Sequence, residues 1–249
     1  MLNDVTELKE LDRLKSEMVR MASHDLKNPL MGAMAYLDLL TEDLENDALL
    51  DVDQERAYAI QMIEKQLLRM DRIIRGILDV ERLRLKVTPN QELCDPRQIV
   101  QHCIDELDFQ IKESSIELNV DIENNIPRFM GSREHFERAL VNLLENAIKF
   151  SVRDEKHIAI KVRSTTDQEV VFEVTDSGVG IPDAVQHRVF DRFFRAEQAG
   201  VEHVTGSGLG LSLVKAVVES QHGRVWLKSQ EGIGTTFYIA VPAAMALRN

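Results

Sequence analysis

Residues 23–30 read Ser23-His24-Asp25-Leu26-Lys27-Asn28-Pro29-Leu30 and lie inside a long helical pattern that shapes the first third of the chain. The apolar residues of this pattern recur at helical spacing and form one stripe: Leu11, Leu14, Met18, Ala22, Leu26, Ala33, Leu37, Leu40 and Leu44. His24 is two residues from Ala22 and from Leu26, which is roughly 200° around the helix from each. We therefore expect its imidazole on the solvent side. A lone histidine in such a position is most often a simple surface residue.

Two long helices are expected to form the first domain. The first runs from about Val5 to Leu44, with a bend at Pro29, whose ring removes a backbone donor. The polar stretch Glu45 to Asp53 makes the turn, and the second helix runs from about Gln54 to Lys86. Its apolar seam has heptad-like spacing: Ile60, Ile63, Leu67, Met70, Ile74 and Ile77. Because a two-helix hairpin cannot enclose a core, we expect two copies to form a four-helix bundle as a homodimer.

The composition excludes several classes of protein. A chain of 249 residues with 44% hydrophobic content can bury a substantial core. Its net charge of -12 argues against nucleic acid or an anionic membrane as the main partner, since both attract clustered Lys and Arg. No run approaches the roughly 20 apolar residues that span a bilayer, and no signal peptide opens the chain. Cys94 and Cys103 lack metal-ligand spacing and suggest no disulfide framework, so we expect a soluble cytoplasmic chain.

The sequence changes character at Thr88-Pro89-Asn90, which ends the second helix, so we expect domains at residues 1–88 and 89–249. Helices then alternate with strands, and the expected elements are a helix that starts at Asp95-Pro96, a strand at Ser115–Ile122, a helix at Arg133–Phe150, strands at His157–Arg163 and Glu169–Thr175, a helix at Leu209–Gln221, and strands at Arg224–Ser229 and Thr235–Val241. This order predicts an α+β sandwich of one mostly antiparallel sheet and one helical layer.

Three polar elements of the second domain are not needed for a core. Asn142, Asn146 and Lys149 share one helix face, where amide oxygens suit Mg²⁺ and an ammonium suits phosphate. Helix asparagines are also commonly just solvated. Asp176 ends a strand and precedes the glycine turn through Pro182, so its carboxylate can accept a hydrogen bond from an exocyclic amine such as that of adenine. The glycine-rich run Thr205–Leu211 opens a helix, and free amides there bind anions.

Together, these elements resemble the conserved boxes of sensor histidine kinases of two-component systems. The resemblance extends from about Leu8 to Pro242 and rests on six segments: Ser23–Leu30 for the phosphoacceptor box, Asn142–Ser151 for the asparagine box, Asp176–Pro182 for the first glycine box, Phe190–Arg195 for the phenylalanine box, Gly206–Leu211 for the second glycine box, and Glu231–Thr235 for the closing glycine turn. Each segment alone is a weak signal, but six in register are highly specific.

The resemblance implies a dimerisation and phosphoacceptor hairpin, with a preceding signalling helix, followed by a GHKL-type ATP-binding domain with an α/β sandwich fold. The residues that would hold ATP are Asn142, Asn146, Lys149, Asp176, Gly178, Gly180, Phe190, Arg195, Gly206, Ser207, Gly208, Leu209 and Gly210. In this family pattern Asn146 coordinates Mg²⁺ with support from Asn142, and Lys149 and Arg195 contact phosphate. Asp176 would bind adenine, and the residues from Ala196 to Thr205 would form a lid over ATP.

The expected reaction is autophosphorylation of His24, which would attack the γ-phosphorus of ATP while Asp25 holds the imidazole tautomer and accepts its proton. The phosphoryl group would then pass to an aspartate in the receiver domain of a response regulator. Asn28, one turn from His24, resembles the position that orients water for dephosphorylation of that regulator, so phosphatase activity is also expected. A GHKL ATPase and a non-catalytic dimeric scaffold are the alternatives. The first residues resemble the exit from a sensor domain, so we expect this chain to belong to a longer sensor protein, which could be tethered to a membrane.

Overall fold

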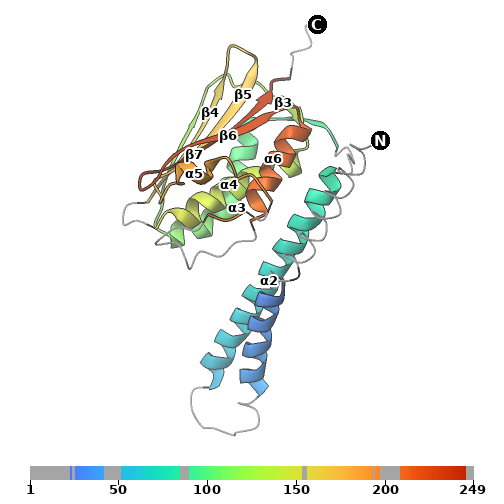
Figure 1. Ribbon diagram of the computed structural model, residues 1–249, viewed down its shortest axis with the longest axis vertical. Coiled ribbons are helices and arrows are strands. Elements are labelled where there is room, and N and C mark those ends of the chain that lie inside the picture. The colour runs from blue at the N-terminus through green and yellow to red at the C-terminus, as the bar shows by residue number, and fades with distance from the viewer. Residues whose placement is uncertain are drawn as a thin grey trace. The chain divides into compact units, whose positions relative to one another are not determined.

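Figure 1 shows the computed structural model of the chain, which describes residues 23, 26–41, 52–84, 90–152, 156–192, 194–196 and 208–244. The chain divides into two compact units, Met1–Asp79 and Val80–Asn249. The first unit is helical and the second combines helices with sheets, which confirms the predicted two-domain α+β organisation. In this described part of the chain, no helix is both long and apolar enough to cross a membrane.

The helical elements are residues 26–41, α2 (Val52–Arg84), α3 (Pro96–Glu113), α4 (Arg133–Phe150), α5 (Asp183–Gln186) and α6 (Gly210–Ser220). The strands are β1 (Glu92–Cys94), β2 (Glu117–Ile122), β3 (Phe129–Gly131), β4 (His157–Ser164), β5 (Glu169–Asp176), β6 (Arg224–Gln230) and β7 (Gly234–Pro242).

The helical run 26–41 and α2 form an antiparallel hairpin. Gly32 lies against the side chain of Gln66, and further along the first helix Tyr36 meets Tyr58 edge to face, with ring centroids 6.2 Å apart. Residue numbers therefore rise in one helix as they fall in the other. Many large apolar side chains of the hairpin are exposed: Leu30, Met31, Met34, Leu37, Leu39, Tyr58, Ile60, Leu67, Leu68 and Ile74. A single hairpin thus leaves much of its apolar surface in water, as expected for half of a bundle.

The second unit is built on a five-stranded sheet with the strand order β2-β4-β5-β7-β6. β2 runs parallel to β4, and the other neighbours are antiparallel. Alternate residues of β4 are buried, because side chains of a strand point to opposite faces. Helices α3, α4 and α6 cover the buried face (Figure 1). The core between the layers includes these fully buried side chains: Phe129, Phe136, Phe172, Leu107, Leu140, Leu143, Leu144, Ile99, Ile158, Ile160 and Ile239.

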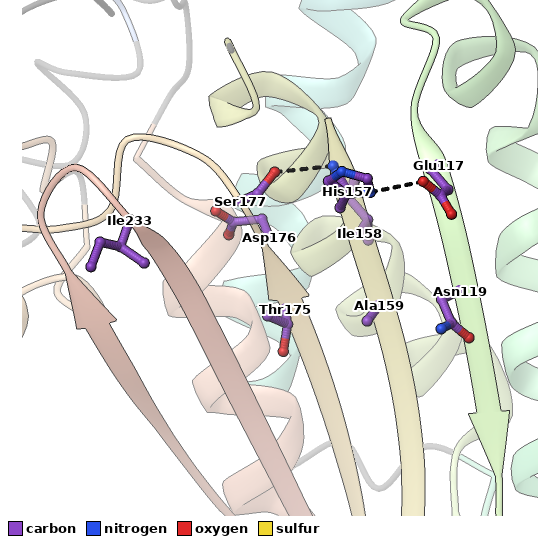
Figure 2. A pocket seen from close by; sticks show the side chains of 9 residues that line it. All are labelled: Glu117, Asn119, His157, Ile158, Ala159, Thr175, Asp176, Ser177 and Ile233. Carbon is purple, nitrogen blue, oxygen red and sulfur yellow. Dashed lines mark hydrogen bonds and ion pairs between the residues drawn. The ribbon is translucent and has the colours of Figure 1, made fainter. Parts of the chain in front are cut away.

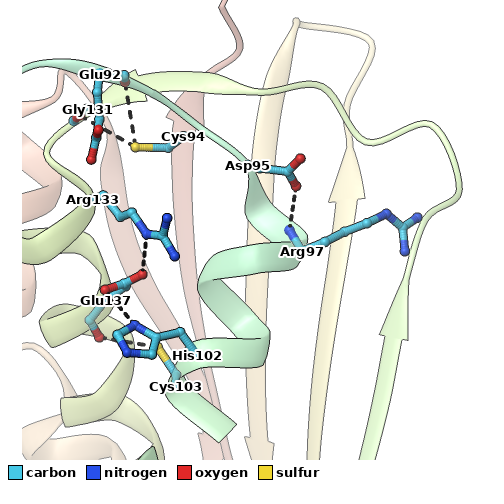
Figure 3. A network of polar contacts seen from close by, with 9 residues as sticks. All are labelled: Glu92, Cys94, Asp95, Arg97, His102, Cys103, Gly131, Arg133 and Glu137. Atoms are coloured by element: carbon cyan, nitrogen blue, oxygen red, sulfur yellow. Dashed lines mark hydrogen bonds and ion pairs between the residues drawn. The ribbon is translucent and has the colours of Figure 1, made fainter. Parts of the chain in front are cut away.

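A polar network joins α3 to α4 on the outside of this core (Figure 3). Glu137 of α4 pairs with Arg133 at 2.6 Å and with His102 of α3 at 2.8 Å. At the start of α3, Asp95 caps the helix by accepting a hydrogen bond from the backbone N–H of Arg97 at 3.0 Å, and Pro96 occupies the first turn. The predicted helix start at Asp95-Pro96 is therefore correct.

The structure also differs from the sequence-based expectations. A second, two-stranded sheet pairs β1 with β3, and neither strand was predicted because each has three residues, too few for a periodic pattern. The short helix α5 was missed for the same reason. The strand expected from Ser115 begins only at Glu117, because Ser115 adopts a φ of 54° in the turn that ends α3. A left-handed residue of this kind ends a helix rather than starting a strand.

Candidate functional site

Asp176 ends β5 and is only 7% exposed. Its Oδ1 accepts hydrogen bonds from the backbone N–H groups of Gly178 at 2.9 Å and Thr235 at 3.3 Å. Burial raises the pKa of the carboxyl to about 6, and the two hydrogen bonds only partly oppose this rise. Among the described residues both donors reach Oδ1, so Oδ2 is the oxygen left for a ligand. A buried carboxylate with one oxygen available suits recognition of an amine.

The glycine turn after Asp176 packs too closely for side chains. A Cβ on Gly178 would lie 2.4 Å from the carbonyl oxygen of Phe150, at the end of α4. A Cβ on Gly180 would lie 2.0 Å from the carbonyl oxygen of Gln230, and the φ of Gly180 is 71°. The turn is therefore held between the end of α4 and the end of β6, and glycine is required at both positions.

One face of α4 carries the predicted polar residues. Asn142, Asn146 and Lys149 are all half-buried. The Asn142 amide nitrogen donates to the carbonyl oxygen of Arg138 at 2.9 Å, which orients the side chain and leaves its Oδ1 as an acceptor. The Lys149 ammonium lies 3.6 Å from the carboxylate of Glu145. Sequence analysis did not select Glu145, although its spacing from Asn142 and Lys149 placed it on the same helix face.

The start of α6 lies next to this face. A Cβ on Gly210 would meet the Asn142 Oδ1 at 2.9 Å, so the first residue of α6 and the Asn142 amide are neighbours. Gly208 has a φ of 68°, and Leu209 is 4% exposed and anchors the turn in the core. The first backbone N–H groups of a helix attract anions. The structure thus brings Asn142 together with Gly210, the last glycine of the second glycine box.

The segment after α5 contributes packing as well as charge. Phe190 contacts Phe237 edge to face, with ring centroids 6.2 Å apart, and packs against the core. Its observed contact is therefore structural. Arg195 is exposed. The guanidinium of Arg188 lies 4.5 Å from the ring centre of Phe194.

Several predicted site residues lie outside the described part of the chain: His24, Asp25, Gly206, Ser207 and most of the expected lid. In the first unit, Asn28 is exposed and Pro29 lies within the helical run 26–41, where it is buried. The role expected for Asn28 stays a prediction.

A shallow pocket of about 310 Å³ lies at the ends of β2, β4 and β5 (Figure 2). The residues that line it are Glu117, Asn119, His157, Ile158, Ala159, Thr175, Asp176, Ser177 and Ile233. None of these residues comes from α4 or α6. Thr175 and Ala159 are cross-strand partners on the face of the sheet away from the core, so the pocket opens on that face. Asp176 also lines it, so the pocket adjoins the buried carboxylate but includes none of the polar residues of α4.

Two family models match separate parts of the chain. Residues 14–86 match the His Kinase A phospho-acceptor domain, and residues 131–245 match the histidine kinase-, DNA gyrase B- and HSP90-like ATPase. The two matches have the order and spacing that the conserved boxes predicted. The chain belongs to the sensor histidine kinases. The predicted family is therefore confirmed.

Relatives within the sensor histidine kinases include the sensor protein kinase WalK of Staphylococcus aureus, which is 26% identical over 243 residues. This match covers 97% of the chain and 57% of the relative. WalK of the JH9 strain shows the same identity, but the match covers 39% of its length. The chain therefore spans roughly half or less of the length of these relatives.

Solved histidine kinase structures share the fold. The kinase AdeS of Acinetobacter baumannii superposes with a TM-score of 0.68 at 17% identity, over 88% of this chain and 98% of that chain. The kinase ThkA, solved in complex with the response regulator protein TrrA, gives a TM-score of 0.71 at 21% identity, over 96% of this chain and 65% of that chain. The GHKL-type fold predicted for the second domain is confirmed.

Proposed function

We propose that this chain is the catalytic region of a sensor histidine kinase, which uses ATP to phosphorylate His24 and transfers the phosphoryl group to an aspartate of a response regulator. The observation that carries this proposal is the buried Asp176 carboxylate with its glycine turn, set in a domain that matches the histidine kinase-like ATPases. Residues 1–88 would form the dimerisation and phosphoacceptor domain, and residues 89–249 the ATP-binding domain. ATP as substrate implies a cytoplasmic location for this region.

The residues of the second unit fit ATP at both ends. Asp176 Oδ2 would accept a hydrogen bond from the adenine amine, and Gly178 and Gly180 let the turn pack closely beside this carboxylate. Lys149 and the exposed Arg195 would contact phosphate, and the glycine box residues would wrap the triphosphate: Gly206, Ser207, Gly208, Leu209 and Gly210. Asn142, whose Oδ1 is left as an acceptor, and Asn146 would hold Mg²⁺, which when bound offsets charge on the phosphates.

The chemistry assigned to the first unit is nucleophilic. The neutral imidazole of His24 would form an N–P bond to the γ-phosphorus as the bond from that phosphorus to the ADP oxygen breaks. Asp25 would orient the imidazole and accept the proton that the ring loses. Positioning and electrostatics supply most of the catalysis in such a transfer. Asn28 would later orient water for removal of phosphate from the regulator.

A homodimer is part of the proposal. The exposed apolar residues of the first helix include Leu30, Met34 and Leu37, spaced by four and three residues along one stripe. On α2, Ile60, Leu67 and Ile74 are exposed at successive steps of seven. Burial of both stripes against a second hairpin would make a four-helix bundle. A response regulator is the proposed partner, and the ThkA complex with TrrA supports it by analogy.

The test is incubation with γ-labelled ATP and Mg²⁺. We expect an acid-labile label on the unmodified chain and on the His222→Gln control, which replaces an exposed histidine in the turn after α6. His24→Gln should bind nucleotide normally and carry no label. Nucleotide binding without any label on the unmodified chain would favour the scaffold alternative, and a label that persists in His24→Gln would exclude His24 as the phosphoacceptor.

A further inference from the structure

Glu145 places a negative charge in a site that is otherwise suited to anions. It lies on the α4 face that carries Asn142 and Lys149, and its Oε2 is 3.6 Å from the Lys149 ammonium. Its side chain is 12% exposed, so solvent screens the charge less than at the surface. The start of α6, an anion-binding element, lies against Asn142 on the same face.

A carboxylate here opposes the binding of a free triphosphate in two ways. It repels the phosphates directly, and it neutralises Lys149, the cation assigned to them. A pair of this kind, four residues apart on one helix face, is also a common structural contact. A carboxylate beside amide oxygens is well suited to a hard divalent cation.

We propose that Glu145 makes nucleotide binding depend on the divalent cation. In the nucleotide-free chain its carboxylate holds Lys149. With a magnesium nucleotide bound, Lys149 would contact the phosphates, and the negative charge of Glu145 would favour the cation that Asn142 and Asn146 would hold. Glu145 is thus a positioning residue that favours the metal-loaded nucleotide over the free one. This inference rests on the proposed ATP site.

The experiment measures the affinity of the whole chain for a fluorescent ATP analogue, once with Mg²⁺ and once with EDTA. Glu145→Gln removes the charge and keeps the size of the side chain. We expect roughly three- to tenfold tighter binding in EDTA, because a repulsive charge has gone. The gain in affinity on adding Mg²⁺ should shrink by about tenfold, since the cation loses a favourable charge. Glu145→Asp should restore most of that gain.

Glu219→Gln is the matched control, because Glu219 forms the same type of pair with Lys215 on α6 at 3.9 Å but is 59% exposed. The gain in affinity that this variant shows on adding Mg²⁺ should equal that of the unmodified chain. The inference is overturned if Glu145→Gln changes the affinity by the same factor in Mg²⁺ and in EDTA, because the residue then has no preference for the metal-loaded nucleotide. A failure of the unmodified chain to bind the analogue in either condition would instead refute the proposed ATP site.

Discussion

At the scale of one residue, Asp176 combines a proposed binding role with a cost to folding. Its carboxylate is 7% exposed, and burial raises its pKa from 3.8 to about 6. Because the folded-state pKa lies above the unfolded one, the protonated form favours folding and the ionised form opposes it. The loss of stability from the buried charge begins as the pH rises above about 4 and is complete above about 6. A carboxylate kept in such a place despite this cost indicates function.

Asp176→Asn is therefore expected to raise the free energy of unfolding at pH 7.5 by up to about 3 kcal/mol and to weaken ATP binding by at least about tenfold. The amide oxygen still accepts from Gly178 and Thr235, but the amide is a poor match for the adenine amine. The increase in the free energy of unfolding should fall to about 1 kcal/mol at pH 4.5. Urea unfolding at both pH values and titration with ATP give the measurements. Asp167→Asn, in an exposed turn, is the control, and equal gains at both pH values would disprove the charge explanation.

At the scale of the elements, two glycines lie against different kinds of neighbour. Gly180 has a positive φ and faces the backbone carbonyl of Gln230, which the β6–β7 hairpin holds in place. Gly210 begins α6 and faces the end of the Asn142 side chain, which can rotate. Gly180 therefore allows the turn to pack against backbone, and Gly210 leaves space for the Asn142 side chain.

Alanine substitutions at these two positions should separate an effect on stability from an effect on ATP binding. Gly180→Ala is expected to destabilise the second unit by at least about 2 kcal/mol, since both the φ and the contact with backbone are unfavourable. Gly210→Ala should change the free energy of unfolding by less than about 1 kcal/mol, because alanine suits a helix. It should nevertheless weaken ATP binding, since the Asn142 amide must move. Thermal unfolding and ATP titration of both variants test this pair, and a well-folded Gly210→Ala that binds ATP normally would count against a role for Asn142.

At the scale of the whole molecule, the two units obtain their stability in different ways. The second unit encloses its own core, with many side chains fully buried between the sheet and the helices. In the hairpin, Leu67 is 53% exposed and Ile60 is 59% exposed. In the proposed homodimer a second copy would bury these residues of the hairpin, whereas the second unit already encloses its core.

Leu67→Asp is expected to convert the dimer to a monomer, because it places a charge in the seam of the bundle. The thermal transition of the second unit should stay unchanged. Sedimentation equilibrium measures the mass, and Lys65→Asp, at an exposed polar residue two positions away on α2, should leave the dimer intact. A monomeric unmodified chain at micromolar concentration would contradict the bundle.

Much of the fold was predictable because its signals are local. The helix expected at Arg133–Phe150 has those bounds in the structure, and the strand expected at His157–Arg163 extends by one residue. The helix start at Asp95 and Pro96 was also predicted from the sequence. Elements of three or four residues, such as β1 and α5, were missed, because one turn or one alternation is too short to establish a period.

Helical and strand periods, caps and glycine turns depend on neighbouring residues, so the printed sequence was sufficient to predict both domains, the family and the polar face of α4. Contacts between residues that are distant in the sequence could be identified only from the folded structure. The contact between Asp176 and Thr235, the raised pKa of that carboxyl and the approach of Gly210 to Asn142 each join segments far apart in sequence. Desolvation and close packing depend on everything that surrounds an atom, and only three-dimensional folding determines those surroundings.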